Sequence, residues 1–157
     1  MFKDATEGTE NRMFQFDKLA LMPEVTNYIR AAGAKRLKAS KVFYVARCFR
    51  NETTTGAERL REFTQIGVEI LGDNPLDCCK VARRDAIKLF QTLDCEDPWV
   101  LEDGVKRGLN LYLEGGKTFE ISSKDEEDAY QVLGGGTYEG GAGWALGLER
   151  LMLFLGR

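Results

Sequence analysis

The sequence predicts an α+β fold in which helices flank an antiparallel β-sheet. Short segments rich in β-branched and aromatic residues recur along the chain, separated by glycine pairs or acidic turns, which is typical of antiparallel strands. Two longer segments carry apolar residues at helical spacing and predict helices that cover the sheet. The 157 residues suffice for one core, so we expect residues 1–157 to form a single domain.

The first part of the chain predicts an arm, a hairpin and a helix. Residues 1–12 are polar and predict a flexible arm or loop, and residues 13–21 alternate apolar and polar side chains about a turn. We expect a helix to begin at Pro23, because proline suits a first helical turn, and to stop at Gly33. Residues 41–50 are rich in β-branched and aromatic side chains and predict a strand.

A second strand, after a polar loop at residues 51–60, has two unlike faces. Thr64, Ile66, Val68 and Ile70 alternate with Phe63, Gln65, Gly67 and Glu69. An aromatic residue and a glycine stand among the polar residues of the second face. That face therefore predicts a floor on which a flat ligand lies.

The rest of the chain predicts one long helix, further strands and a C-terminal helix. Asn74 and Pro75 are a good helix start, and buried positions recur from there to Leu93. We expect strands at residues 99–101, 107–113, 117–121 and 130–133, and a glycine-dense stretch at 134–143 that leads into a helix over 146–155.

The composition excludes several classes of function. The net charge of −3 gives no electrostatic footprint for nucleic acid, and the basic run at residues 35–41 is typical of a solvated helix end. The chain has no histidine, so Ser-His-Asp and Cys-His nucleophile arrangements are excluded. Its four cysteines lack CxxC spacing, so we expect no metal site and a reducing, cytoplasmic location. No apolar run approaches the length that spans a bilayer, and we expect no membrane contact.

Two segments with paired arginine and glutamate carry a family resemblance. Residues 49–52 (FRNE), a loop and residues 59–63 (RLREF) resemble motif 2 of class II aminoacyl-tRNA synthetases, and residues 143–151 (GWALGLERL) resemble motif 3. Transfer of AMP to a carboxylate needs positive charge held on the triphosphate, and the planar guanidinium grips phosphate through two bonds. The resemblance implies the class II catalytic-core fold, ATP and Mg²⁺. It also implies an ATP-binding set of Arg50, Glu52, Arg59, Arg61, Phe63 and Arg150.

In that set, the resemblance gives each side chain a role. Arg50 would contact the α-phosphate, Arg59 and Arg150 the γ-phosphate end, Glu52 the adenine amino group and Phe63 the adenine face. The apolar setting of Arg150 supports such a role separately, since its guanidinium must point to solvent or to a bound anion. A salt bridge of Arg150 with Glu149 or another acidic neighbour is the structural alternative.

Four further segments are similar to the histidyl type within this class. Residues 21–26 (LMPEVT) resemble its LRPEGT segment and residues 65–69 (QIGVE) its QxGxE strand. Residues 107–112 (RGLNLY) resemble RGLDYY, and residues 135–140 (GGTYEG) resemble GGRYDG. The implied amino-acid site comprises Glu24, Thr26, Gln65, Glu69, Tyr112 and Tyr138, and Arg107 would join Arg50 as a catalytic residue at the α-phosphate.

The sequence also departs from the family pattern. Met22 and Thr137 stand where the family has arginine, and Asn110 and Leu111 stand where it has Asp-Tyr. We find no motif 1, which builds the family's dimer interface, and no anticodon-binding domain.

The resemblance predicts an ATP-dependent ligase that joins ATP and an amino acid, histidine by the resemblance, as an aminoacyl-adenylate. It leaves tRNA as a candidate acceptor and a homodimer as an open alternative. Two other functions remain: a regulatory paralogue like the synthetase-like subunit of ATP phosphoribosyltransferase, and an interaction module.

Overall fold

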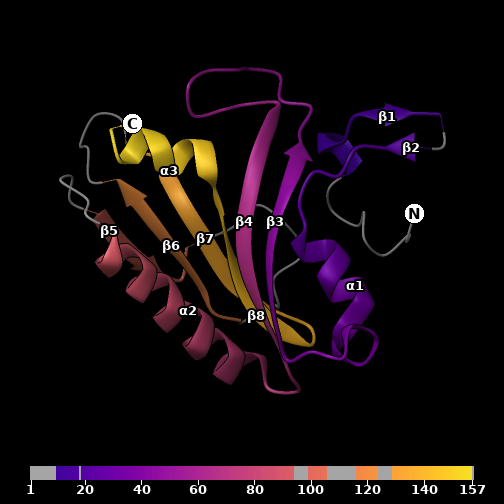
Figure 1. Ribbon diagram of the computed structural model, residues 1–157, viewed down its shortest axis with the longest axis vertical. Coiled ribbons are helices and arrows are strands. Elements are labelled where there is room, and N and C mark those ends of the chain that lie inside the picture. Colours follow the sequence, from indigo (N-terminus) through magenta and orange to yellow (C-terminus); the bar gives the residue numbers. More distant parts are fainter. Residues whose placement is uncertain (1–9, 18, 94–98, 106–115, 124–128, 157) are drawn as a thin grey trace.

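A six-stranded antiparallel sheet forms the centre of the molecule (Figure 1). The computed structural model describes residues 10–17, 19–93, 99–105, 116–123 and 129–156. The strand order is β3-β4-β8-β7-β6-β5. The strands are β3 (Lys41–Phe49), β4 (Glu62–Leu71), β5 (Trp99–Asp103), β6 (Thr118–Ser123), β7 (Gln131–Tyr138) and β8 (Gly141–Gly147). The predicted α+β class is confirmed.

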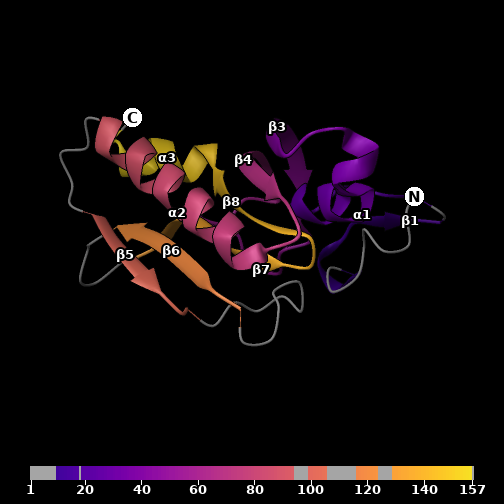
Figure 2. The same cartoon turned by 90° about the horizontal axis from the view of Figure 1, so that it is seen from below.

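Helices cover the two faces of the sheet unequally (Figures 1 and 2). On one face, α2 (Pro75–Thr92) and α3 (Leu148–Phe154) pack on strands β4, β7 and β8. On the other face, α1 (Thr26–Leu37) packs near the β3 and β4 end. Among the described helices, only α2 and α3 pack on β7 and β8.

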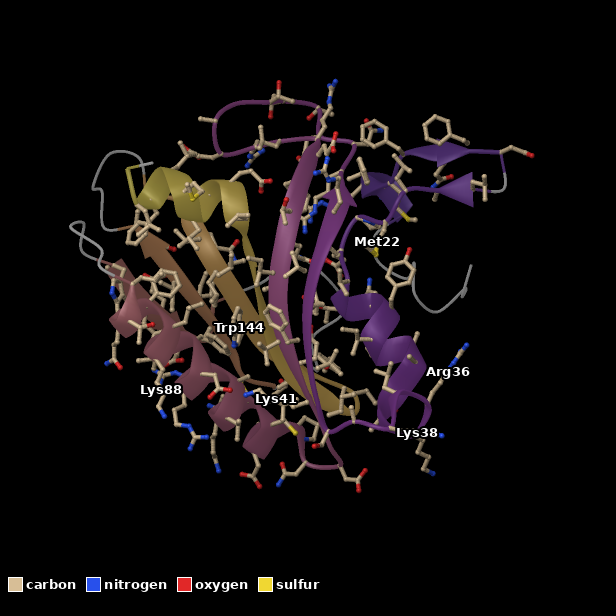
Figure 3. All side chains as sticks on the ribbon, viewed as in Figure 1. Met22, Arg36, Lys38, Lys41, Lys88 and Trp144 are labelled. Carbon is tan, nitrogen blue, oxygen red and sulfur yellow. The ribbon has the colours of Figure 1, made fainter. Side chains whose placement is uncertain are left out.

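The larger core lies between the sheet and α2. Trp144 of β8 sits between the sheet and α2, as Figure 3 shows, beside Val68 of β4 and Phe90 of α2. The helix begins as predicted, because the Asn74 side chain accepts a hydrogen bond from the Asp77 backbone N–H (3.3 Å). The two faces predicted for β4 are also present, since Val68 packs in this core while Phe63 packs with α1 on the opposite face.

The helix that was predicted to run from Pro23 to Gly33 has different ends. It begins at Thr26, because Val25 accepts the first helical hydrogen bonds. It continues beyond Gly33 to Leu37 through a kink, where Gly33 has a φ of 67°. Its exposed end carries Arg36 and Lys38, which project away from the body of the molecule in Figure 3. The start at Thr26 leaves Glu24 in the turn before the helix.

The glycine-dense segment forms two paired strands, which the sequence prediction missed. Residues 134–136 lie inside β7, and β8 runs through Gly147, so that the last helix begins at Leu148. Glycine disfavours strands, but ladder hydrogen bonds to β4 and β6 on either side hold these two in the sheet.

The remaining elements lie near the N-terminus or outside the described residues. The predicted hairpin is confirmed as β1 (Gln15–Phe16) and β2 (Leu19–Ala20). Part of the predicted arm is ordered, because Glu10–Arg12 form a 3-10 turn whose Arg12 carbonyl accepts from the Asn51 N–H. The strand predicted at residues 107–113 lies outside the described residues. None of the helices described is long and apolar enough to cross a membrane.

Candidate functional site

A pocket of about 840 Å³ opens on the sheet face that α2 and α3 do not cover. Its floor is made largely of bare backbone, because Gly134, Gly136, Gly143 and Gly147 present no side chain there. These glycines alternate along β7 and β8, and strand alternation places each on the same face as Gln65 and Glu69 of β4. The glycine-dense segment is therefore explained by the space above the sheet.

Glu69 is the most buried charged group beside this pocket. Its side chain has no exposed surface. Its carboxylate accepts hydrogen bonds from the Thr26 hydroxyl (2.7 Å) and the Tyr138 hydroxyl (2.9 Å). Burial raises the pKa of Glu69 to about 7, although both hydroxyl donors oppose that rise. Thr26 and Tyr138 line the pocket, so Glu69 lies directly behind its wall.

A single glycine makes room for the Glu69 carboxylate. Gly143 of β8 pairs across the sheet with Glu69, and a Cβ at Gly143 would collide with that carboxylate. The segment that resembles motif 3 begins at Gly143, and this glycine leaves the space that the Glu69 carboxylate occupies.

Gln65 and Glu24 extend the polar wall toward the pocket mouth. The Gln65 side-chain oxygen accepts from the Val25 backbone N–H (2.9 Å) and so ties β4 to the turn before α1. That turn carries Glu24, which is 6% exposed and lines the pocket. Glu24 Oε2 lies 3.9 Å from Nη2 of Arg50. The structure thus brings together Glu24, Thr26, Gln65, Glu69 and Tyr138, whose roles toward an amino acid remain predictions.

Tyr44 belongs to the same wall, and the sequence prediction missed it. Its hydroxyl lies 3.4 Å from the Thr26 hydroxyl. Its ring covers Gly67, its neighbour on β4, where a Cβ would collide with the ring. Gly67 in the middle of an otherwise ordinary strand was the available signal, because an interior glycine marks a close approach.

Arg50 lies where the sequence places a nucleotide. Its guanidinium stacks on the Phe63 ring at 4.8 Å from the ring centroid, and Nε donates to the Pro23 carbonyl (3.1 Å). Burial lowers the pKa of Arg50, and the negative charge of Glu24 opposes this. Arg50 therefore covers one face of the ring that was predicted to contact adenine.

Arg150 is held by backbone carbonyls from two separate segments. Nε donates to Glu58 O (2.7 Å) and Nη1 donates to Gln131 O (3.0 Å). The alternative pairing with Glu149 is not formed, because the Glu149 carboxylate accepts from the Thr64 backbone N–H at 2.8 and 3.0 Å. Glu149 thereby fixes the start of α3 to β4, while Arg150 points toward the pocket it lines.

The loop between β3 and β4 carries the remaining predicted nucleotide residues. Glu52 and Arg59 line the pocket, and Glu52 lies 3.7 Å from Nη2 of Arg12. Arg61 is exposed, donates from Nε to Glu52 O (3.0 Å) and is not among the described lining residues, so the structure does not bring it into the site. Arg107 and Tyr112 lie outside the described residues.

The fold of the chain belongs to a known structural class. The crystal structure of apo S. aureus histidyl-tRNA synthetase superposes with a TM-score of 0.67 over 92% of this chain and 55% of that chain, at 22% identity. Desulfitobacterium hafniense pyrrolysyl-tRNA synthetase superposes with a TM-score of 0.61 over 90% of this chain and 53% of that chain, at 21% identity. The chain has the catalytic-core fold of class II aminoacyl-tRNA synthetases, as its sequence predicted.

Sequence similarity points to a more particular group of proteins. The chain is 34% identical over 96 residues to the ATP phosphoribosyltransferase regulatory subunit of Thermoanaerobacter sp. (strain X514), which covers 56% of this chain and 25% of that protein. The subunit of the same name from Caldanaerobacter subterraneus subsp. tengcongensis is 42% identical over 73 residues, or 41% of this chain and 19% of that protein. The chain thus spans about a quarter of the length of the first of these relatives. No protein-family model matches the sequence.

Proposed function

We propose that this chain is a ligand-sensing domain of the ATP phosphoribosyltransferase regulatory-subunit kind, and that it binds an amino acid, histidine, without activating it. The observation that carries the proposal is a difference within the pocket. The side chains of the amino-acid wall hydrogen-bond to one another around Glu69, whereas Arg50 and Arg150 donate to backbone carbonyls of this chain. The names of the similar regulatory subunits support the same choice.

The wall has the chemistry that an amino acid with a polar side chain requires. Glu24 offers a carboxylate to an ammonium group at the pocket surface. Behind the wall, the Thr26 and Tyr138 hydroxyls donate hydrogen bonds to Glu69. A hydroxyl can also accept a hydrogen bond from a ligand, or donate to the ligand in place of Glu69. A ring nitrogen of histidine suits such a pair because it is a donor in one tautomer and an acceptor in the other.

A nucleotide is a second proposed ligand of the same pocket. Arg50, Glu52, Arg59, Phe63 and Arg150 line it and would face a purine nucleotide once Arg50 leaves the Phe63 ring. The described residues contain no group of three side chains able to hold a metal. Magnesium would accordingly enter with the triphosphate, held by phosphate oxygens and water, as is common for this ion.

Amino-acid adenylation is the second candidate function, because Arg50 and Arg150 are both present in one pocket with a predicted adenine shelf. It requires each guanidinium to leave its carbonyl partners and stabilise charge on the phosphates. Amino-acid-dependent ATP–pyrophosphate exchange tests it. Exchange with any amino acid would replace the sensing proposal, and tRNA charging would then identify the acceptor.

The sensing proposal is tested with the ATP phosphoribosyltransferase encoded by the same genome. We expect the chain, in its full-length form, to bind that enzyme and to make its activity depend on L-histidine. We also expect no pyrophosphate exchange from the chain itself. An enzyme whose activity is the same with and without the chain, at every histidine concentration, would contradict the proposal.

A further inference from the structure

We propose that Tyr44 limits the size of the side chain that an amino-acid ligand can bring into the pocket. The inference rests on the amino-acid site of the proposed function and adds the residue that sets its selectivity. Tyr44 lies outside every segment that resembles the synthetase family, and its ring reaches from β3 over Gly67 of β4. A ligand side chain that extends past the Thr26 hydroxyl would therefore meet the end of this ring.

Gly67 is the residue that lets the Tyr44 side chain lie across the sheet. The two residues are paired neighbours on β3 and β4. A Cβ at Gly67 would collide with Cζ and Oη of Tyr44, and it would lie 2.8 Å from the backbone oxygen of Trp144 in β8. The hydroxyl end of Tyr44 therefore lies above β4, next to the strand β8 that forms part of the pocket floor.

The same end of Tyr44 fills the space between two polar residues of β4. Gln65, Gly67 and Glu69 follow one another on this face of the strand, and only the glycine has no side chain. The Tyr44 hydroxyl lies 3.4 Å from the Thr26 hydroxyl, which lines the pocket and donates to Glu69. Tyr44 thus stands directly behind the Thr26 part of the wall.

The Tyr44 ring has little freedom to move away from a ligand. It packs against the core cluster that contains Ile29 and Tyr138, and burial raises the pKa of its hydroxyl well above the ordinary value. Close-packed side chains resist the insertion of even one extra methyl group. At a closed apolar wall, one such group changes affinity about tenfold to two-hundredfold.

Calorimetry with L-histidine, N1-methyl-L-histidine and N3-methyl-L-histidine measures this limit, because the methylated ligands keep the ring and add one methyl group. We expect wild type to bind at least one methylated ligand about tenfold or more weakly than L-histidine. Tyr44→Leu removes the end of the ring and should bring that ratio below about threefold. Tyr44→Phe removes only the hydroxyl and should give an intermediate ratio.

Phe43→Leu is the matched control. Phe43 precedes Tyr44 on β3 and points to the opposite face of the sheet, where it is 66% exposed. This variant also replaces an aromatic residue by leucine, and it should keep all three affinities within about twofold of wild type. Each ratio compares two ligands on one variant, so a general loss of stability does not produce a change of ratio. Circular dichroism verifies that each variant is folded.

The outcomes separate this inference from the proposed function. If wild type binds L-histidine but Tyr44→Leu keeps the wild-type ratio, or loses all three ligands, Tyr44 does not limit ligand size and the sensing function stands. Equal changes in Tyr44→Phe and Tyr44→Leu would assign the selectivity to the hydroxyl and overturn the steric role. If Tyr44→Leu does not fold, an unchanged ratio in Tyr44→Phe overturns the inference.

A wild-type chain that binds no L-histidine would show that the histidine ligand of the proposed function is wrong. The size limit is then measured by titrating the common amino acids into wild type and Tyr44→Leu. Tyr44→Leu should bind a larger amino acid than wild type binds. An identical range of ligands in the two proteins would overturn the inference.

Discussion

The two halves of the pocket differ in the partners to which their polar groups bond. In the amino-acid half, carboxylate and hydroxyl side chains from α1, β4 and β7 bond to one another around Glu69. In the nucleotide half, Arg50 and Arg150 bond to backbone carbonyls, and Arg50 covers the predicted adenine shelf. The groups around Glu69 are oriented by one another, whereas Arg50 and Arg150 must give up bonds to backbone carbonyls before they can hold a phosphate.

This difference is informative about function. Efficient transition-state stabilisation of phosphoryl chemistry depends on charges that are oriented beforehand, because reorganisation during the reaction is costly. A sensor has no such requirement, since binding alone can move Arg50. This arrangement of Arg50 is the reason that we propose sensing ahead of adenylation.

The largest expected effect on ligand binding comes from adding one methyl group to the glycine floor of the pocket. Gly143→Ala would drive a Cβ into the Glu69 carboxylate, so the wall around Glu69 must shift. We expect a loss of L-histidine binding of at least about a hundredfold, together with a lower melting temperature, in keeping with the ~1–3 kcal/mol typical of overpacking. Calorimetry and thermal unfolding measure the two effects.

Gly147→Ala is the control on the same strand. A Cβ at Gly147 would approach only Arg150 side-chain carbons, at 4.0 Å, which is an ordinary contact. If Gly143→Ala and Gly147→Ala lose the same amount of L-histidine binding and of thermal stability, the collision with the Glu69 carboxylate is not the cause of the loss.

Glu69→Gln should change how stability depends on pH. The carboxyl pKa is raised to about 7 by burial, above its ordinary value, so its contribution to stability is fully present in acid and lost as pH rises toward 7. Glutamine does not titrate, so the variant does not lose this contribution. As pH rises from about 4 to about 8, the wild type should therefore lose up to about 3 kcal/mol of stability relative to Glu69→Gln. Urea unfolding across this range measures the slope. A flat Glu69→Gln difference across this range would mean that burial does not raise the Glu69 pKa.

Tyr138→Phe should have a smaller effect in the same half. It removes one hydroxyl donor from the buried carboxylate, which we expect to cost about 1.5–3 kcal/mol of stability at neutral pH. The loss should shrink in acid, where Glu69 is protonated. A loss of the same size at every pH would indicate that the hydroxyl does not interact with the charged carboxylate.

Phe63→Ala should act on the nucleotide half alone. Removal of the ring takes away the surface on which a base would stack, and we expect ATP to bind about tenfold more weakly, which corresponds to about 1.4 kcal/mol. Binding of L-histidine without ATP should change little, because Phe63 touches none of the hydrogen bonds around Glu69. A large loss of histidine binding would break the division of the pocket into two halves.

Much of this site could be predicted from local sequence rules. The alternation along β4 placed Gln65 and Glu69 on one face, and side-chain period alone is sufficient for that. The glycine floor could not be predicted in the same way, because strands β7 and β8 are held by hydrogen bonds to neighbours distant in sequence. The partners of Arg150 were also beyond local rules, since Glu58 and Gln131 meet it only through the fold.

The most direct test of the contrast between the two halves is calorimetric titration of the nucleotide-free chain with L-histidine. An amino-acid wall that is already assembled predicts saturable binding of one L-histidine per chain in the complete absence of ATP. Glu69→Gln should weaken that binding. Binding of L-histidine that appears only after ATP is added, or no binding at all, would contradict the account.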